Sequence, residues 1–295
     1  MAGLRVPAAS LVFVLVAAVS SASATAQGPV FNGVGADDLI DFTTWNLYGD
    51  ASALNYTPGD GNTYSILSLT QPGVGSQAGA AFAPTTVMLD FNAPFTITFD
   101  FYMSPGSVLA GDGMTFVLTP HDPQTVNGGD PLVPSGGSDL GYGGTGLDGL
   151  AFAIDTFNFG GEPVAPSIQF LTGSDVTPVE FSETGLADIR DPSYFQWHAT
   201  LSYAPSGSDD TTGTLTGTID QFIGGLSFSV SYSLSGNDLG LHDVPLYYGF
   251  TAANGLADDG HHVLSAAPVP EPETYALLFA GLGLVAWRVR RAARA

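Results

Sequence analysis

The residues best suited to binding chemistry lie in residues 146–161. An apolar strand pattern over residues 150–154 ends there in Asp155, Thr156, Phe157 and Asn158, and a glycine-rich segment at residues 136–144 leads into it. Carboxylate, amide and backbone carbonyl oxygens are hard ligands, which suit a calcium ion or a polyol better than acid–base catalysis. We therefore expect a binding site where this strand ends.

The charge distribution excludes several classes of partner. Only six of the 295 residues are basic, and Arg190 is the only one of them between about residues 27 and 287. A body with a single basic side chain cannot form the positive patch that nucleic acids and other polyanions require, so we expect no nucleic-acid partner. Its acidity suits calcium binding, or a salty or acidic medium, but the acids could equally serve only to solubilise an exported protein. The chain has no cysteine, which excludes disulfides, thiolate metal sites and cysteine nucleophiles.

The elements that must position this site are predicted to be β-strands. Polar and apolar residues alternate with period two over residues 95–101, 195–203, 214–219 and 226–234, which is typical of half-buried antiparallel strands. Clusters of turn-forming residues separate them, and no long segment of helical period occurs between residues 30 and 265. We predict about a dozen strands in one all-β domain over residues 27–267, folded as an antiparallel two-sheet jelly-roll sandwich.

Both ends of the chain have the character of export signals. Residues 1–26 combine Arg5, an apolar run at residues 11–19 and a small-residue cleavage site ending at Ala26, which predicts a secretion signal peptide. Residues 268–273 form a proline-rich linker. Residues 274–287 are apolar and are followed by arginines, so residues 274–295 are predicted to anchor in the membrane with a cytoplasmic Arg-rich end and the β body outside. An interfacial helix is the alternative, disfavoured because the segment has no polar face.

This C-terminal order resembles a known sorting signal. Pro270, Glu271 and Pro272, a hydrophobic helix and an Arg-rich end are similar to the PEP-CTERM signal of exopolysaccharide-producing Gram-negative bacteria. The resemblance covers residues 268–295. It implies recognition by an exosortase, cleavage near Pro270–Pro272, and then release or relocation to the cell surface or the extracellular matrix.

The body resembles L-type (legume-lectin-like) lectins. The similar blocks follow the order of that family and lie at residues 42–45 with 77–82, 111–118, 140–144, 150–158, and 248–255 with 262–265. The resemblance implies that sugar hydroxyls are held by Asp112, by the Gly137 N–H and by Asn158, with Phe157 or Tyr142 stacked on the sugar. It also implies a calcium ion held by Asp155, the Phe157 carbonyl, Asn158 and Glu162.

Some positions depart from the family pattern. Ala153 stands where the family has a glutamate, and Ser167 stands near the place of a metal-binding histidine, so no second, transition-metal site is expected. Asn158 lies three residues beyond Asp155, whereas the family's asparagine lies four beyond. Either a one-residue deletion reshapes this loop, or Asn158 is not the equivalent ligand.

Catalysis is not expected. The laminarinase-type glycoside hydrolases share the fold, but their catalytic carboxylates would fall at Ala153 and Asn158, which can supply neither nucleophile nor proton. The nucleophile-elbow, zincin and Walker motifs are also missing. We interpret Asp258 and Asp259 as solvated loop acids, and His261 and His262 as packing or solvent residues. The sequence thus predicts a non-catalytic, calcium-assisted protein that binds glycan or exopolysaccharide. A structural matrix or adhesion protein is the alternative, and a divergent polysaccharide hydrolase is less favoured.

Overall fold

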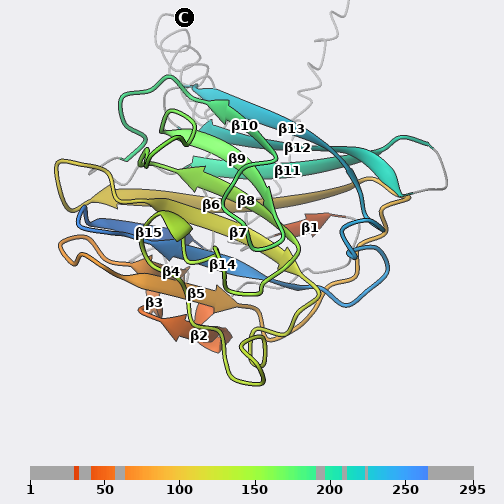
Figure 1. Ribbon diagram of the computed structural model, residues 1–295, viewed down its shortest axis with the longest axis horizontal. Coiled ribbons are helices and arrows are strands. Elements are labelled where there is room, and N and C mark those ends of the chain that lie inside the picture. Colours follow the sequence, from red (N-terminus) through yellow and green to blue (C-terminus); the bar gives the residue numbers. More distant parts are fainter. Residues whose placement is uncertain are drawn as a thin grey trace, which may run out of the picture.

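The computed structural model describes residues 30–32, 41–56, 64–190, 197–207, 211–222 and 225–264, with only the backbone described for residues 30–32 (Figure 1). The expected signal peptide with Ala26, the linker with Pro270, Glu271 and Pro272, and the C-terminal anchor lie outside these residues. Within the described part of the chain, no helix is long and apolar enough to cross a membrane.

The described chain folds into two antiparallel sheets that form two layers (Figure 1). The eight-stranded sheet has the order β13-β12-β11-β6-β15-β4-β3, with β1 also paired to β6. Its strands are β1 (Val30–Asn32), β3 (Ser52–Tyr56), β4 (Tyr64–Thr70), β6 (Phe95–Pro105), β11 (Trp197–Pro205), β12 (Thr212–Gln221), β13 (Ser227–Ser235) and β15 (Asp259–Leu264).

The seven-stranded sheet has the order β10-β9-β8-β7-β14-β5-β2. Its strands are β2 (Asn46–Gly49), β5 (Ala78–Phe82), β7 (Gly113–Thr119), β8 (Leu150–Asp155), β9 (Ser167–Thr172), β10 (Glu180–Glu183) and β14 (Tyr247–Ala253). Two short 3-10 helices, η1 (Phe42–Thr44) and η2 (Gly137–Asp139), complete the described elements. The predicted all-β sandwich is confirmed, and the four alternating segments form β6, β11, β12 and β13.

The main core lies between the two sheets. Along β8, Leu150, Phe152 and Ile154 point into it, because successive side chains of a strand face opposite sides. Phe250 lies at its centre, with its ring 5.0 Å from that of Phe99 and 5.4 Å from that of Phe116. Each such buried aromatic contributes roughly 1.5–3 kcal/mol of hydrophobic stabilisation. The core holds the ends of β7 and β8 in a fixed position.

The other face of the seven-stranded sheet is covered as well. Ala151 and Ala153 of β8 pack there in a second cluster with Leu140, Tyr142 and Leu147, which come from the long segment between β7 and β8. Every residue of β7 and β8 is therefore buried. This two-sided burial explains why residues 150–154 are apolar throughout instead of alternating. Asp155 belongs to the same covered face as Ala153, because the two are separated by one residue.

Candidate functional site

Two aspartates meet at one end of the seven-stranded sheet. β7 and β8 are antiparallel, and Gly113 pairs with Asp155, so Asp112 lies beside the end of β8. Gly113 has a φ of +145°, and a Cβ at this position would come within 2.3 Å of the Ile154 carbonyl oxygen. Only glycine fits there, and the close approach it allows brings Asp112 against Asp155. Both side chains are buried, with Asp112 7% and Asp155 5% exposed.

The Asp155 carboxylate is bound by neutral donors. Its Oδ1 accepts from the Phe157 N–H at 3.0 Å, and its Oδ2 accepts from the Gln169 amide at 2.8 Å. Burial raises the pKa of Asp155 to about 7, and the nearby charges of Glu162 and Asp112 act in the same direction. The ionised form of Asp155 is therefore destabilised by its surroundings, and a bound cation would stabilise it.

Asp112 has a similar environment. Burial is the main cause that raises the pKa of Asp112, and the charges of Glu162 and Asp259 add to it. The backbone N–H groups of Asp112 and Gly255 donate to its carboxylate and partly offset this rise. Gly255 belongs to the loop between β14 and β15, and a Cβ there would lie 3.3 Å from the Asp112 Oδ2. The 254–258 loop therefore packs directly on Asp112.

The group Asp112, Asp155 and Glu162 thus concentrates negative charge without a basic partner. Arg190, the single Lys or Arg among the described residues, pairs instead with Asp188 and Asp259. Buried carboxylates without a counter-charge are costly, and all-oxygen donor sets of this kind are those that calcium prefers. The oxygen donors at this end are therefore of the type that calcium prefers, although the carboxylate oxygens of Asp112, Asp155 and Glu162 are not all within 4.8 Å of one another.

The loop after β8 is closed by Asn158. The Nδ2 of Asn158 donates to the backbone oxygens of Glu162, at 2.9 Å, and Pro163, at 2.8 Å. The Phe159 N–H donates to the Glu162 Oε2 at 2.6 Å. Because both amide hydrogens of Asn158 are bonded within the loop, this residue can offer a ligand only its Oδ1. Phe157 is half-buried, whereas Phe159 is 64% exposed.

Two residues predicted for the sugar site lie in the covering segment. Gly137 opens η2, which packs on β14, and no hydrogen bond between described residues joins Gly137 to Asp112 or Asn158. Tyr142 is fully buried, and its hydroxyl accepts from the Ser174 N–H at 3.0 Å, so the expectation that its ring stacks on a sugar is wrong. Phe159 is the exposed aromatic of the loop after β8. The sequence prediction did not include it, although its position beside Gly160 and Gly161 is typical of an exposed loop residue.

The strand positions beside Asp155 carry no ionisable group. Ala153 is fully buried and pairs with Gln169, while Asp155 pairs with Ser167. The Gln169 amide bonds both Asp155 and, at 2.9 Å, the Ser167 hydroxyl. At these described positions there is neither a carboxylate nor a histidine to hold a second metal or to act as a catalytic pair with Asp155.

One acid expected to be solvated is buried. Asp259 is 0% exposed, accepts from the Gly111 N–H at 2.6 Å and pairs with the Arg190 Nη1 at 2.7 Å, so its interpretation as a loop acid is wrong. His261 and His262 are buried packing residues, which is one of the two alternatives predicted for them. Burial lowers the pKa of His261 to about 3 and that of His262 to about 4.

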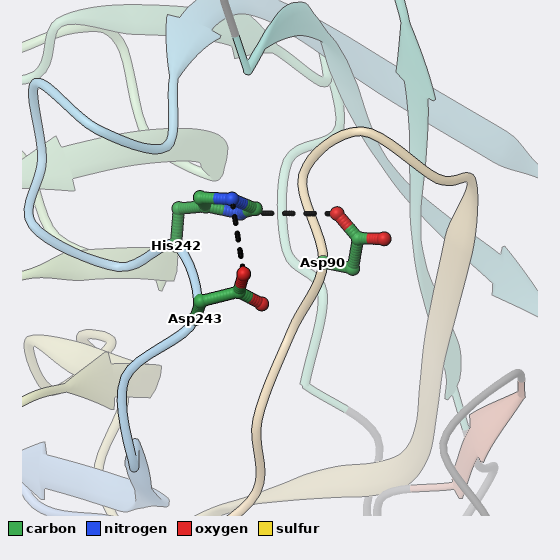
Figure 2. Close-up of side chains that lie close together, drawn as sticks. All are labelled: Asp90, His242 and Asp243. Atoms are coloured by element: carbon green, nitrogen blue, oxygen red, sulfur yellow. Dashed lines mark ion pairs between the residues drawn. The ribbon is translucent and has the colours of Figure 1, made fainter. Parts of the chain in front are cut away.

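A separate polar group, Asp90, His242 and Asp243, joins two loops (Figure 2). The Phe91 N–H donates to the His242 Nδ1 at 3.1 Å, and the His242 Nε2 faces the Asp243 carboxylate at 3.3 Å. This group lies near the first residues of β6, whereas the candidate site around Asp112 lies near the last residues of β6. Since both ring nitrogens of His242 are already committed and the acids are more than half exposed, we interpret it as a link between loops.

Comparison with known proteins agrees with the fold described above. Residues 268–292 match the PEP-CTERM protein-sorting motif. No curated protein matches the chain by sequence. The structure is similar to the lectin from Bauhinia forficata in complex with GalNAc (19% identity, TM-score 0.57, covering 80% of this chain and 96% of that one).

Two further lectins show the same likeness, each over 80% of this chain and 95% of theirs with a TM-score of 0.56. They are the metal-free lectin I-B4 from Griffonia simplicifolia, at 19% identity, and the basic winged bean lectin with Tn-antigen, at 16%. The chain therefore has a legume-lectin-like jelly-roll fold. It is an exported protein with a C-terminal PEP-CTERM sorting signal.

Proposed function

We propose that the protein is a non-catalytic, calcium-assisted carbohydrate-binding protein of the bacterial envelope or exopolysaccharide matrix. The observation that supports this most is that burial and the nearby charge of Glu162 raise the pKa values of both Asp112 and Asp155, which have no basic partner, at one end of a lectin-like sandwich. A bound cation would neutralise part of the negative charge of this group.

Different residues of this group would bind the cation and the sugar. Asp155 and Glu162, with the Phe157 carbonyl and the Asn158 Oδ1, would hold calcium, which supplies positive charge that fixes these oxygens in place. Asp112 would accept hydrogen bonds from sugar hydroxyls, and its neighbouring Gly255 N–H holds that carboxylate in position. Gly137 remains a proposed N–H donor. Phe159 presents an exposed ring for the apolar face of a sugar.

Export and sorting complete the proposal. The signal peptide would be removed after Ala26, and the segment 274–295 would anchor the protein transiently in the inner membrane with the β body outside the cytoplasm. An exosortase-type enzyme would then cleave near Pro270, Glu271 and Pro272, and the body would reach the cell surface or the matrix. The motif match at residues 268–292 supports this route.

Glycan binding in calcium and in chelator tests the proposal. The array should include GalNAc and the Tn antigen, the ligands in two of the similar structures, and the matrix polysaccharide of the producing cell. We expect binding that requires calcium and is lost in Asp112→Ala. The control is Asp100→Ala, another buried acid, which lies on the eight-stranded sheet and pairs with His198. Wild-type protein that binds no glycan in either condition would refute the proposal.

A structural matrix or adhesion protein is a second candidate, favoured by one observation. Both amide hydrogens of Asn158 donate to carbonyl oxygens of its own loop, which suits a structural role better than a sugar site. In that case Asp112→Ala and Asp155→Ala would leave surface retention and biofilm formation unchanged, whereas the carbohydrate-binding proposal expects both to weaken.

A further inference from the structure

Arg190 occupies an unusual position for the single basic side chain of the described body. Its side chain is only 4% exposed, and its guanidinium lies against the loop at residues 106–111, which connects β6 to β7. The Nη1 donates to the backbone oxygens of Leu109 at 3.0 Å and Ser107 at 3.3 Å, and the Nη2 donates to that of Val108 at 3.2 Å. Three consecutive carbonyls are thus held by one side chain.

Two carboxylates complete the arrangement. Arg190 binds the Asp188 carboxylate at 2.8 Å and the Asp259 Oδ1 at 2.7 Å. Asp259 in turn accepts from the N–H groups at both ends of the same loop, Gly111 at 2.6 Å and Gly106 at 3.4 Å. The loop is therefore clamped in its middle by Arg190 and at its ends by Asp259.

Apolar packing does not hold this loop. Val108 is 96% and Leu109 is 64% exposed, so the side chains at its tip contribute little burial. Other bonds join the N–H groups of Gly106 and Ser107 to the Asp258 carbonyl, and the Asp258 N–H to the Ser107 hydroxyl, which itself donates to the Leu109 carbonyl at 2.8 Å. These bonds hold residues 106–109. Gly111, the residue before Asp112, is held by Asp259 on one side and by Thr156 on the other.

The clamped loop leads directly into the candidate site. The Thr156 N–H donates to the Asp112 carbonyl at 2.9 Å, and the Thr156 hydroxyl donates to the Gly111 carbonyl. Thr156 follows Asp155, so any shift of Gly111 moves Asp112 relative to Asp155. Arg190 reaches this junction through a single intermediate, Asp259.

We propose that Arg190, acting through Asp259, is a positioning residue that fixes the 106–111 loop and thereby sets the separation of Asp112 from Asp155 in the ligand site. This inference rests on the carbohydrate-binding function proposed above. Arginine suits the role because its planar fork of five donors can bind several carbonyls and two carboxylates at once, which lysine cannot.

The test separates positioning from mere stability. Arg190→Met alone would leave Asp259 buried and unpaired and could fail to fold, so the informative variant is Arg190→Met with Asp259→Asn, which removes both charges together. For this double variant we expect at least a tenfold weaker calcium and glycan affinity, with saturable binding retained at high ligand concentration. Arg190→Lys should lose affinity in the same direction despite keeping the charge.

Two controls and a ligand-independent readout make the outcome decisive. Asp188→Asn, which removes only the 44% exposed partner, should keep affinity within about twofold. Amide exchange at Gly111 and Thr156 should accelerate at least tenfold in the double variant, while amides of β11 and β12 keep their protection. Wild-type affinity together with wild-type exchange at Gly111 would overturn the inference. Faster exchange in a protein whose wild type binds neither calcium nor glycan would refute the proposed function while sustaining the role of Arg190 in fixing the loop.

Discussion

Replacing Asp155 by asparagine should stabilise the calcium-free protein. The substitution removes a buried charge and changes the shape of the side chain very little. The Phe157 N–H keeps an oxygen acceptor, and the Gln169 amide can turn over to accept from the new amide group. If Asp155 served only to stabilise the fold, its replacement would instead lower the free energy of unfolding, because losing a buried hydrogen-bonded group normally costs free energy.

The magnitude follows from the pKa of Asp155. Its value rises from 3.8 to about 7 on folding, and each unit corresponds to about 1.4 kcal/mol. A carboxyl whose pKa is raised in the folded state adds stability below pH 3.8 and loses it as the pH rises through 7. Ionised Asp155 therefore costs about 4 kcal/mol at pH 8, and less than about 1 kcal/mol at pH 4.

The assay is urea unfolding of wild type and Asp155→Asn in chelator at both pH values. We expect the variant to be more stable by up to about 4 kcal/mol at pH 8, which is about 2–4 °C in Tm per kcal/mol for a domain of this size, and nearly equal at pH 4. Calcium at a thousand times its Kd should remove this advantage at pH 8, since it adds about 4 kcal/mol to the wild type alone. A variant that is less stable in chelator at pH 8, or that gains as much from calcium as the wild type, would refute this reasoning.

Three further substitutions test the core packing, the acid sensitivity and the ligand contact separately. The pKa of His261 falls from 6.5 to about 3 on folding, so its stabilising contribution is complete above pH 6.5 and is lost as the pH falls, by about 3 kcal/mol at pH 4. In urea unfolding at pH 7 and pH 4, His261→Gln should lose less stability on acidification than the wild type, and an equal loss would contradict this. Phe250→Ala should cost about 3–5 kcal/mol in the same assay, because the ring is fully buried among other aromatics, and a cost below about 1 kcal/mol would argue against that packing. Phe159→Ala should weaken glycan binding by up to about tenfold with an unchanged Tm, and unaltered affinity would remove Phe159 from the site.

Local patterns predicted the sheets well. The alternation in β6, β11, β12 and β13 reflects one buried and one exposed face, and this property depends only on neighbouring residues. The short strands β1, β2 and β10 have only three or four residues, too few for a period to show, which is why about a dozen strands were expected where the described residues form fifteen. Asp112 and Asp155 were placed together through the lectin resemblance, and the pairing of Gly113 with Asp155 gives the physical reason.

Non-local contacts account for the rest. Asp259 lies in a segment rich in Asp and Gly that has the composition of a solvated turn, and the partner that buries it, Arg190, is 69 positions away. Tyr142 follows a glycine-rich run that favours exposure, yet Ser174, from beyond β9, binds its hydroxyl. The Asn158 spacing leaves open whether this loop is reshaped or Asn158 is not the equivalent ligand, and its bonds to Glu162 and Pro163 are local contacts of an irregular loop. Neither the long-range pairs nor the bonds of an irregular loop leave a periodic signal in the sequence.

The most direct measurement of the central claim is the electron density around the Asp155 carboxylate in crystals grown with calcium and a bound glycan. The account predicts a cation with six to eight oxygen ligands at about 2.3–2.6 Å, Asp155 and Glu162 among them, and sugar hydroxyls on Asp112. An Asp155 carboxylate that keeps only its bonds to Phe157 and Gln169, with no cation density at saturating calcium and the glycan bound elsewhere, would contradict it.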